Sequence, residues 1–375
     1  MKKSFLLLCS VLSLVACAEK ETTLPEKATS PKGPKNIILL IADGTGLSQV
    51  SAAQFYKEGP SNYDRFPVVG LIKTSSSNAV ITDSAAGATA FACGEKTYNG
   101  AIGLDKDSLK VKNIVTIASE KGMQTGVIAT SSITHATPAS FFAHSKSRNF
   151  HEEIAAFLPN SEIDFFAGAG LQYFNKRKDS INLLEVFKNK GFIIDTLSLQ
   201  NSKGDKSGYL LAPKSMPRML DGRGDFLPKA TQLGMDKLSE NNKGFFLMVE
   251  GSQVDWGGHE NNGEYLISEL IDFDTTLGTV LDFAEKDGET LVIVTADHET
   301  GGFTLSSKEE DYNTLEATFS THGHSATMVP VFAFGPGSEN FGGIYENTEI
   351  FHKMVLLLSE EKKGDKTNKA VILLP

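Results

Sequence analysis

Short, strongly apolar runs alternate with amphipathic stretches along most of the chain. The apolar runs predict β-strands buried on both faces, because such strands lose the alternation of polar and apolar positions. Stretches in which apolar residues recur at helical spacing predict helices that cover the sheet. The predicted strands are 36–42, 68–73, 125–130, 163–167, 245–249, 290–295 and 329–334, and the predicted helices include 112–121, 227–239 and 265–285.

This alternation is typical of an α/β fold with a mostly parallel sheet covered by helices. The 375 residues suit one large domain or two small ones, and neither a repeat nor a clear domain boundary is visible. Residues 195–225, rich in Gly, Lys, Ser and Pro, are expected to be an irregular surface excursion.

Three of the predicted strands lead directly into acidic residues. Asp43 follows strand 36–42, Glu250 follows 245–249, and Asp297 comes just after 290–295. Ligands of open parallel sheets bind beyond the carboxyl ends of the strands, so these acids are expected at one edge. A single acid after a strand is more often a turn or cap residue. Three together would repel one another unless cations neutralised them, which favours a metal centre.

Histidine is scarce, with eight in the chain, and several have a spacing that suits a metal. Asp255 and His259 are four residues apart, close enough to share one divalent cation. Asp297 and His298 form a second oxygen and nitrogen pair, and His324 lies just before the last predicted strand. Each histidine alone could be a hydrogen-bonded structural residue. As a set without thiolates, they predict zinc in an open, catalytic site.

Ser84 is a candidate nucleophile. It lies in the segment Thr82-Asp83-Ser84-Ala-Ala-Gly-Ala-Thr-Ala, where a polar turn leads into small residues that favour a helix. A serine at a helix N-terminus would be close to backbone N–H groups and a dipole that favour an anion. The alternative is that Asp83 or Ser84 merely caps the helix. Because the chain has no Gly-x-Ser-x-Gly elbow, activation of this serine by zinc rather than by histidine fits the sequence.

The order of the motifs resembles that of the alkaline phosphatase family. The matching motifs are Asp43-Gly, Thr82-Asp-Ser-Ala, Thr97-Tyr-Asn-Gly, His135-Ala-Thr-Pro, Glu250-Gly-Ser-Gln-Val-Asp, Thr295-Ala-Asp-His-Glu-Thr-Gly-Gly and His324. The length and the lack of large insertions are similar to the short, cold-active bacterial members. The resemblance implies that residues 36–375 form a single catalytic domain, a three-layer αβα sandwich, and that the protein is a homodimer.

The resemblance also implies two zinc ions and one magnesium ion per subunit. The first zinc would be held by Asp255, His259 and His324. The second zinc would be held by Asp43, Asp297, His298 and the Ser84 oxygen. The third site, usually magnesium, would be formed by Asp43, Thr137 and Glu250. Arg148 would clamp two phosphate oxygens with its planar guanidinium, although the pattern around it would by itself predict a surface arginine.

Two positions depart from the best-known enterobacterial pattern. His135 stands where that branch has Asp, which removes a carboxylate from the third site and allows zinc there. Trp256 stands where that branch has Lys, which removes a cation that would contact phosphate, directly or through water. With Arg148, both residues are therefore expected to form the substrate-binding region.

The implied activity is the hydrolysis of phosphate monoesters, with broad specificity, through a phosphoserine at Ser84. A phosphodiesterase or sulfatase of the same superfamily is the alternative. Sulfatases mature a Cys or Ser within Cys/Ser-x-Pro-x-Arg, whereas Ser84 is followed by Ala-Ala-Gly-Ala, and the phosphodiesterases generally carry a Thr nucleophile. A non-catalytic exported lipoprotein that binds metal or phosphate is a further alternative, which leaves Ser84 unexplained.

The first residues are typical of an export signal. Two lysines precede the apolar run 5–15, which is too short to span a bilayer and ends in Leu14-Val15-Ala16-Cys17, similar to a lipobox. We therefore expect residues 1–17 to be a signal peptide, Cys17 to be lipidated and residues 18–35 to be a flexible tether. The protein would then be periplasmic and held at a membrane only by this lipid. An ordinary cleaved signal with an incidental cysteine is the alternative.

The composition indicates which partners the protein can bind and how stable it is expected to be. The net charge of −10, without a dense basic patch, argues against nucleic acid, while bound metal could still attract a phosphate ester. Of the three cysteines, Cys93 would have no partner once Cys9 and Cys17 are removed or lipidated, so no structural disulfide is expected. With 34 glycines and 13 prolines, the chain is expected to be flexible and heat-labile, which a melting temperature above about 90 °C would contradict.

Overall fold

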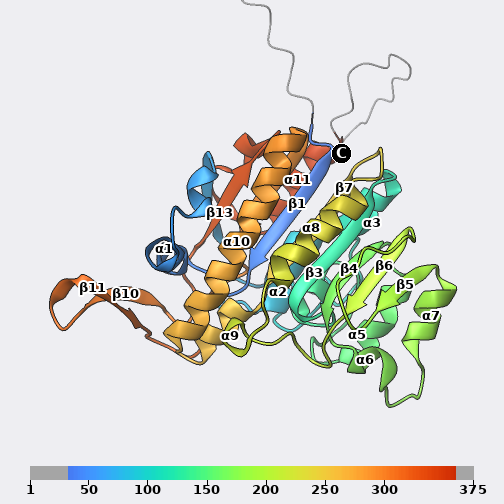
Figure 1. Cartoon of the computed structure of the whole chain (residues 1–375), viewed down its shortest axis with the longest axis horizontal. Helices are drawn as coiled ribbons and strands as arrows, with labels where there is room; N and C mark the ends of the chain where they lie inside the picture. Colours follow the sequence, from blue (N-terminus) through green and yellow to red (C-terminus); the bar gives the residue numbers. More distant parts are fainter. Residues whose placement is uncertain (1–32, 360–375) are drawn as a thin grey trace, which may run out of the picture. The chain divides into compact units, whose positions relative to one another are not determined.

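The computed structural model describes residues 33–359, in which a ten-stranded sheet is flanked by helices (Figure 1). The strands of this sheet are β1 (Asn36–Ala42), β2 (Val68–Lys73), β3 (Gln124–Ser132), β4 (Phe165–Ala169), β5 (Phe192–Asp195), β6 (Lys206–Leu210), β7 (Phe245–Gly251), β8 (Thr290–Thr295), β13 (Val329–Phe334) and β14 (Gly343–Glu346). Their order is β14-β2-β13-β8-β1-β7-β3-β4-β6-β5. Every neighbouring pair is parallel except the two that β13 forms with β2 and β8.

Helices cover both faces of this sheet. They are α1 (Leu47–Tyr56), α2 (Ser84–Cys93), α3 (Ile114–Glu120), α4 (Ala136–Ala139), α5 (His151–Phe157), α6 (Gln172–Asn175), α7 (Leu183–Asn189), α8 (Phe226–Leu238), α9 (Gln253–His259), α10 (Gly263–Asp287) and α11 (Glu349–Ser359). Short 3-10 turns lie at Asn62–Arg65, Leu158–Asn160, Met219–Asp221 and Ser338–Phe341. The predicted three-layer αβα sandwich with a mostly parallel sheet is confirmed.

The central strands have no polar face, which is why they read as continuous apolar runs. Every residue of β1, β7 and β8 is buried. Alternate residues of β1 enter opposite cores: Ile37 and Leu39 pack with α2, α3 and α11, whereas Ile38 and Leu40 pack with α8 and α10. Four predicted strands, 36–42, 68–73, 290–295 and 329–334, have the bounds that the structure gives them. The predicted helices correspond to α3, α8 and α10.

The register of the central strands brings the acidic residues to one level of the sheet. Ile41 of β1 lies opposite Glu250 of β7 on one side and opposite Thr295 of β8 on the other. Asp43 therefore leaves β1 between Glu250 and the start of the segment that carries Asp297. The fold places the three acids at one edge, as their positions after the strands predicted.

The prediction of an irregular surface excursion at 195–225 was wrong in part. Residues 206–210 form β6, a buried strand that pairs in parallel with β4 and β5. The sequence Lys-Ser-Gly-Tyr-Leu has no apolar run because Gly208 lies against the Phe166 ring, where a Cβ would come within 2.1 Å of Cζ. Arg223 is also buried, with its guanidinium paired to Glu269 and Asp272 of α10. The segment between β6 and α8 is otherwise irregular, as expected.

Two small sheets were not predicted. The hairpin of β10 (Thr304–Lys308) and β11 (Asp311–Thr318) projects beside α9 and the start of α10 (Figure 1). The second sheet pairs β9 (Glu299–Thr300) with β12 (His324–Ser325), so that His324 lies opposite Thr300. This pairing joins two segments that carry candidate metal ligands.

No helix within residues 33–359 is both long enough and apolar enough to cross a bilayer. Cys93 is a free, buried thiol. The predicted signal peptide at 1–17, the lipid on Cys17 and nearly all of the tether at 18–35 lie outside the described residues, so they stay predictions.

We predict that Gly208→Ala destabilises the protein by about 1–3 kcal/mol, because the added Cβ would overlap the buried Phe166 ring. Urea unfolding measures this as a lower midpoint with an unchanged slope. Gly342→Ala is the matched control, since Gly342 has a φ of −74° and its Cβ would lie 3.7 Å from Val68, an ordinary contact. Equal stability of the two variants would show that β6 does not pack against Phe166 as described.

Candidate active site and metal centre

Asp255, His259 and His324 form the first cluster of candidate ligands. Their ligand atoms converge: Nε2 of His259 lies 3.4 Å from Asp255 Oδ1 and 3.1 Å from Nε2 of His324, which is 3.7 Å from the same carboxylate oxygen. Both histidines are anchored through Nδ1, to the carbonyl of His322 at 2.6 Å and to that of Thr82 at 2.8 Å.

These hydrogen bonds indicate which ring nitrogen of His259 and His324 carries a proton. A carbonyl can only accept a hydrogen bond, so Nδ1 carries a proton in both rings, and in the neutral imidazole Nε2 then has a lone pair. Two lone pairs and a carboxylate therefore face one another across about 3 Å of space. A cation between them removes this repulsion, and the mixed nitrogen and oxygen donors fit zinc.

Asp43, Asp297 and His298 form the second cluster, and all three side chains are buried. Nε2 of His298 lies 3.2 Å from Asp297 Oδ2 and 3.6 Å from Asp43 Oδ1. Neither oxygen of Asp43 nor Oδ2 of Asp297 has a hydrogen-bond partner among the described residues. Burial, and secondarily the charge of Asp297, raises the pKa of Asp43 well above its ordinary value, while burial lowers the pKa of His298.

A third cluster shares Asp43 with the second. Asp43, His135 and Glu250 present donor atoms within 4.8 Å of one another. Nearby, Oγ1 of Thr137, Nδ1 of His135 and Oε1 of Glu250 are buried without a hydrogen-bond partner. Burial raises the pKa of Glu250 to about 7, although hydrogen bonds from hydroxyls oppose the shift. Orphaned donor atoms of this kind, mostly oxygens, fit a small divalent cation.

Two serines that the sequence did not single out support Glu250. Ser131 at the end of β3 and Ser252 after β7 donate their hydroxyl protons to Glu250 Oε2, at 3.2 and 2.6 Å. They leave Oε1 free for a ligand and fix the direction of the carboxylate. Their role depends on the contact between β3 and β7, which no local motif reports.

Ser84 begins α2, and its hydroxyl is buried at the second cluster. Ser84 Oγ lies 3.3 Å from Nε2 of His298. The cap of α2 is Asp83, whose Oδ1 accepts from the Ala86 N–H at 3.0 Å, so the hydroxyl of Ser84 is not used as the cap. Gly87 lets the helix approach the second cluster, because a Cβ there would lie 2.8 Å from Cβ of Asp297.

Arg148 is held at the site rather than on the open surface. Its Nη1 donates to Asp83 Oδ2 at 3.0 Å, and its Nη2 lies 3.4 Å from Nε2 of His135. The guanidinium contributes to the lowered pKa of His135, after the larger effect of burial. Asp83 therefore both caps α2 and orients Arg148, a double role that the sequence did not reveal.

Trp256 lies beside these residues, on α9 between Asp255 and Gly257. Its ring meets the His135 imidazole edge to face, with centroids 5.9 Å apart. The indole is partly exposed. Trp256, His135 and Arg148 thus lie together, next to the second and third clusters.

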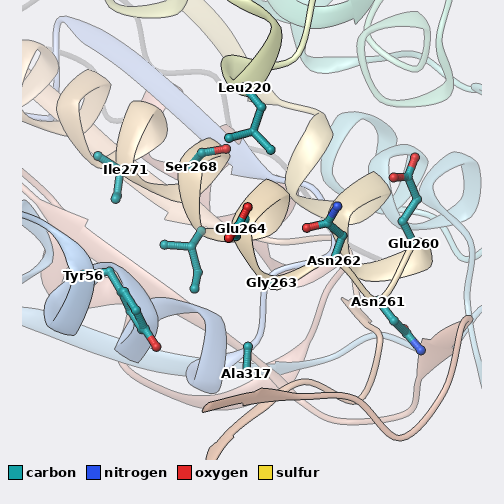
Figure 2. A pocket seen from close by; sticks show the side chains of 11 residues that line it. Tyr56, Leu220, Glu260, Asn261, Asn262, Gly263, Glu264, Ser268, Ile271 and Ala317 are labelled. Atoms are coloured by element: carbon teal, nitrogen blue, oxygen red, sulfur yellow. The ribbon is translucent and has the colours of Figure 1, made fainter. Parts of the chain in front are cut away.

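A groove of about 750 Å³ lies along the α9–α10 turn (Figure 2). In Figure 2, the groove is surrounded by Tyr56 of α1, Leu220 of the 3-10 turn Met219–Asp221 and Ile271 of α10, and Ala317 of β11 lies at its edge. None of the candidate metal ligands lines it.

Comparison with known proteins agrees with the geometry. Residues 34–318 and 306–359 match the family model described as alkaline phosphatase. Alkaline phosphatase 4 of Bacillus subtilis is 36% identical over 97% of this chain and 84% of its own length. The solved structure of alkaline phosphatase from the Antarctic bacterium TAB5 is 56% identical, with a TM-score of 0.86, over 87% of this chain and 98% of that one. A variant of that enzyme, with a histidine replaced by aspartate, is described with magnesium bound in its M3 site.

We predict that Glu250→Gln becomes stabilising, relative to the wild type, as the pH of the metal-free protein rises through about 7. The raised pKa means that folded Glu250 keeps its proton above the pH at which the unfolded residue loses it, so its contribution to stability is lost as pH rises through about 7. Glutamine carries no charge and avoids this loss. Urea unfolding in EDTA at pH 5.5 and 8.5 measures the difference between the two proteins.

The Glu250 charge also raises the pKa of Asp43, so its removal in the glutamine variant acts in the same direction. With metal added, the order should reverse, because glutamine is a poorer metal ligand than a carboxylate. A difference that is independent of pH in EDTA would contradict the assigned protonation of Glu250.

Proposed function

The chain belongs to the alkaline phosphatase family and is a metal-dependent phosphatase, and we propose that it hydrolyses phosphate monoesters of broad structure through a phosphoserine at Ser84. The observation that carries this proposal is the convergence of imidazole nitrogens on buried carboxylates beside a serine hydroxyl. Burying carboxylates this close together costs free energy unless cations neutralise their charge. With the cations bound, the site can bind a phosphate ester.

We assign the metals by cluster. Zinc would be held at the first site by Asp255, His259 and His324. Zinc would be held at the second site by Asp43, Asp297, His298 and Ser84. The third site would be formed by Asp43, Thr137 and Glu250, with His135 beside it. Magnesium suits the oxygen donors there, and the imidazole of His135 makes zinc acceptable as well.

When bound, the zinc ions would lower the pKa of the Ser84 hydroxyl and stabilise the charge that develops on the leaving oxygen. The chain itself provides the positioning. Ser84 is fixed by the first turn of α2, where backbone N–H groups favour an approaching anion. Arg148, oriented by Asp83, would hold two of the equatorial phosphate oxygens.

The reaction would proceed by two in-line displacements. Ser84 Oγ forms a bond to phosphorus as the ester oxygen leaves, and water on the opposite side then displaces Ser84 and releases phosphate. Two inversions give overall retention of configuration at phosphorus.

We also propose a homodimer, a periplasmic location, a lipid on Cys17 and cold adaptation. The first three rest on the sequence and the family. Cold adaptation is supported by the similarity to the TAB5 enzyme and by the glycine content.

We predict that the signal-free protein hydrolyses p-nitrophenyl phosphate at alkaline pH, loses this activity in EDTA and regains it with zinc and magnesium. Ser84→Ala should reduce turnover by several orders of magnitude, because the attacking oxygen is removed. Ser140→Ala is a control, since Ser140 is buried but its hydroxyl donates to the helix carbonyl of Ala136.

Two results would redirect the proposal. Cleavage of a diester or a sulfate ester in place of the monoester would keep the superfamily and change the substrate class. A metal-loaded protein that turns over no ester would favour a metal- or phosphate-binding lipoprotein.

We predict that Trp256→Lys strengthens inhibition by inorganic phosphate and slows turnover. A lysine at this position, next to His135, would place a cation near the product, whereas the indole provides none. The measurement is the inhibition constant of phosphate together with kcat, with Trp256→Phe as the uncharged control. Unchanged product inhibition and turnover in the lysine variant would show that Trp256 does not govern phosphate release.

A further inference from the structure

The hydroxyl of Thr300 lies between the first and second ligand clusters. Thr300 is fully buried on β9, two residues after His298. Its Oγ1 donates to Asp255 Oδ1 at 2.5 Å and lies 3.1 Å from Nδ1 of His298. One side-chain atom thus contacts a candidate ligand of each zinc.

The number of protons fixes the direction of both hydrogen bonds. The hydroxyl has a single proton, which it donates to Asp255 Oδ1. Thr300 Oγ1 must then accept from His298, which places the imidazole proton on Nδ1. Nε2 of His298 is left with a lone pair, and it is this atom that faces Ser84 Oγ and the two carboxylates of the second cluster.

The backbone of Thr300 joins the other segments of the site. Its N–H donates to the carbonyl of Gly44, directly after Asp43, at 3.0 Å. Its carbonyl accepts from Gln49 Nε2 at 3.1 Å, and the residue lies opposite His324 in the β9–β12 pair. The segments that carry Asp43, His298 and His324 therefore all meet at Thr300.

Two glycines make the room that this side chain occupies. A Cβ on Gly44 would lie 2.9 Å from Thr300 Oγ1, and a Cβ on Gly258 would lie 3.0 Å from its Cγ2. Gly44 also has a φ of +75°, which favours glycine. A side chain at Gly44 would occupy the space of the Thr300 hydroxyl, and one at Gly258 would occupy the space of its methyl group.

We propose that Thr300 is a positioning residue that couples the two zinc sites, by orienting Asp255 at the first and by fixing the tautomer and direction of His298 at the second. This inference rests on the proposed metal function. A threonine that merely filled a buried space would bond to backbone, as Thr276 of α10 does through the carbonyl of Asp272 at 3.0 Å. Thr300 instead bonds to the side chains of two ligands.

Loss of the hydroxyl would act on both sites at once. Without it, His298 Nδ1 has no acceptor there, and Asp255 loses a donor that holds its carboxylate. Residues that hydrogen-bond to metal ligands typically contribute about 10–100-fold to metal affinity. We therefore expect the zinc affinity of two of the three sites to fall by about that factor. The third site, which Thr300 does not contact, should keep its affinity.

The test is zinc titration of the metal-free protein in competition with a chromophoric chelator, which resolves the number of sites and the affinity of each. Thr300→Val removes the hydroxyl and keeps the shape, while Thr300→Ser keeps the hydroxyl and removes the methyl group. Thr276→Val is the matched control, because that threonine is equally buried. Urea unfolding without metal checks that Thr300→Val is folded and about as stable as Thr276→Val.

We expect Thr300→Val to lower the zinc affinity of two of the sites. In Thr300→Ser both affinities should be within a few-fold of the wild type, and Thr276→Val should change neither of them. The inference is overturned if Thr300→Val binds all equivalents like the wild type, or weakens only one. It is also overturned if Thr300→Ser is as impaired as Thr300→Val, because packing and not the hydroxyl would then matter. A wild type that binds no zinc would instead refute the proposed metal function, and the inference with it.

Discussion

The structure depends on how it accommodates three buried carboxylates that lie close together. Asp43, Glu250 and Asp297 have raised pKa values, chiefly because they are buried, and oxygens of all three lack a hydrogen-bond donor among the described residues. Burial of an ionised acid costs several kcal/mol unless a positive charge or donors compensate it. Cations at this edge would turn the same arrangement from a cost into a binding site, as we propose for this metal-dependent phosphatase.

The rest of the fold can be understood as the support for this edge. Three fully buried strands determine where the acids lie relative to one another, and helices on both faces shield those strands from solvent. The imidazoles are anchored at Nδ1, which directs Nε2 toward the carboxylates. Such preorganisation lowers the cost of ordering the ligands when an ion binds. In the same way, the Asp83 carboxylate orients the guanidinium of Arg148.

The sequence predicted what depends on local pattern. Strands 36–42 and 290–295 were found because strands buried on both faces are continuous apolar runs, and the acids after them were found from their position alone. Strand β6 was missed because the local pattern of Lys206, Gly208 and Tyr209 reflects packing against Phe166, which is distant in sequence. Arg148 was expected at the phosphate only through the family resemblance. Thr300 and Ser252 lie within recognised motifs, but their bonds to ligands depend on tertiary contacts that periodicity does not encode.

We propose that the reaction forms a phosphoserine at Ser84, and trapping this intermediate tests the proposal most directly. Metal-loaded protein would be mixed with p-nitrophenyl phosphate below neutral pH, where the attacking water is less ionised, then quenched in acid and digested for peptide mass spectrometry. We expect phosphate on the peptide that contains Ser84, and none after EDTA treatment. Steady turnover with no phosphate on that peptide, or with phosphate on another residue, would contradict it.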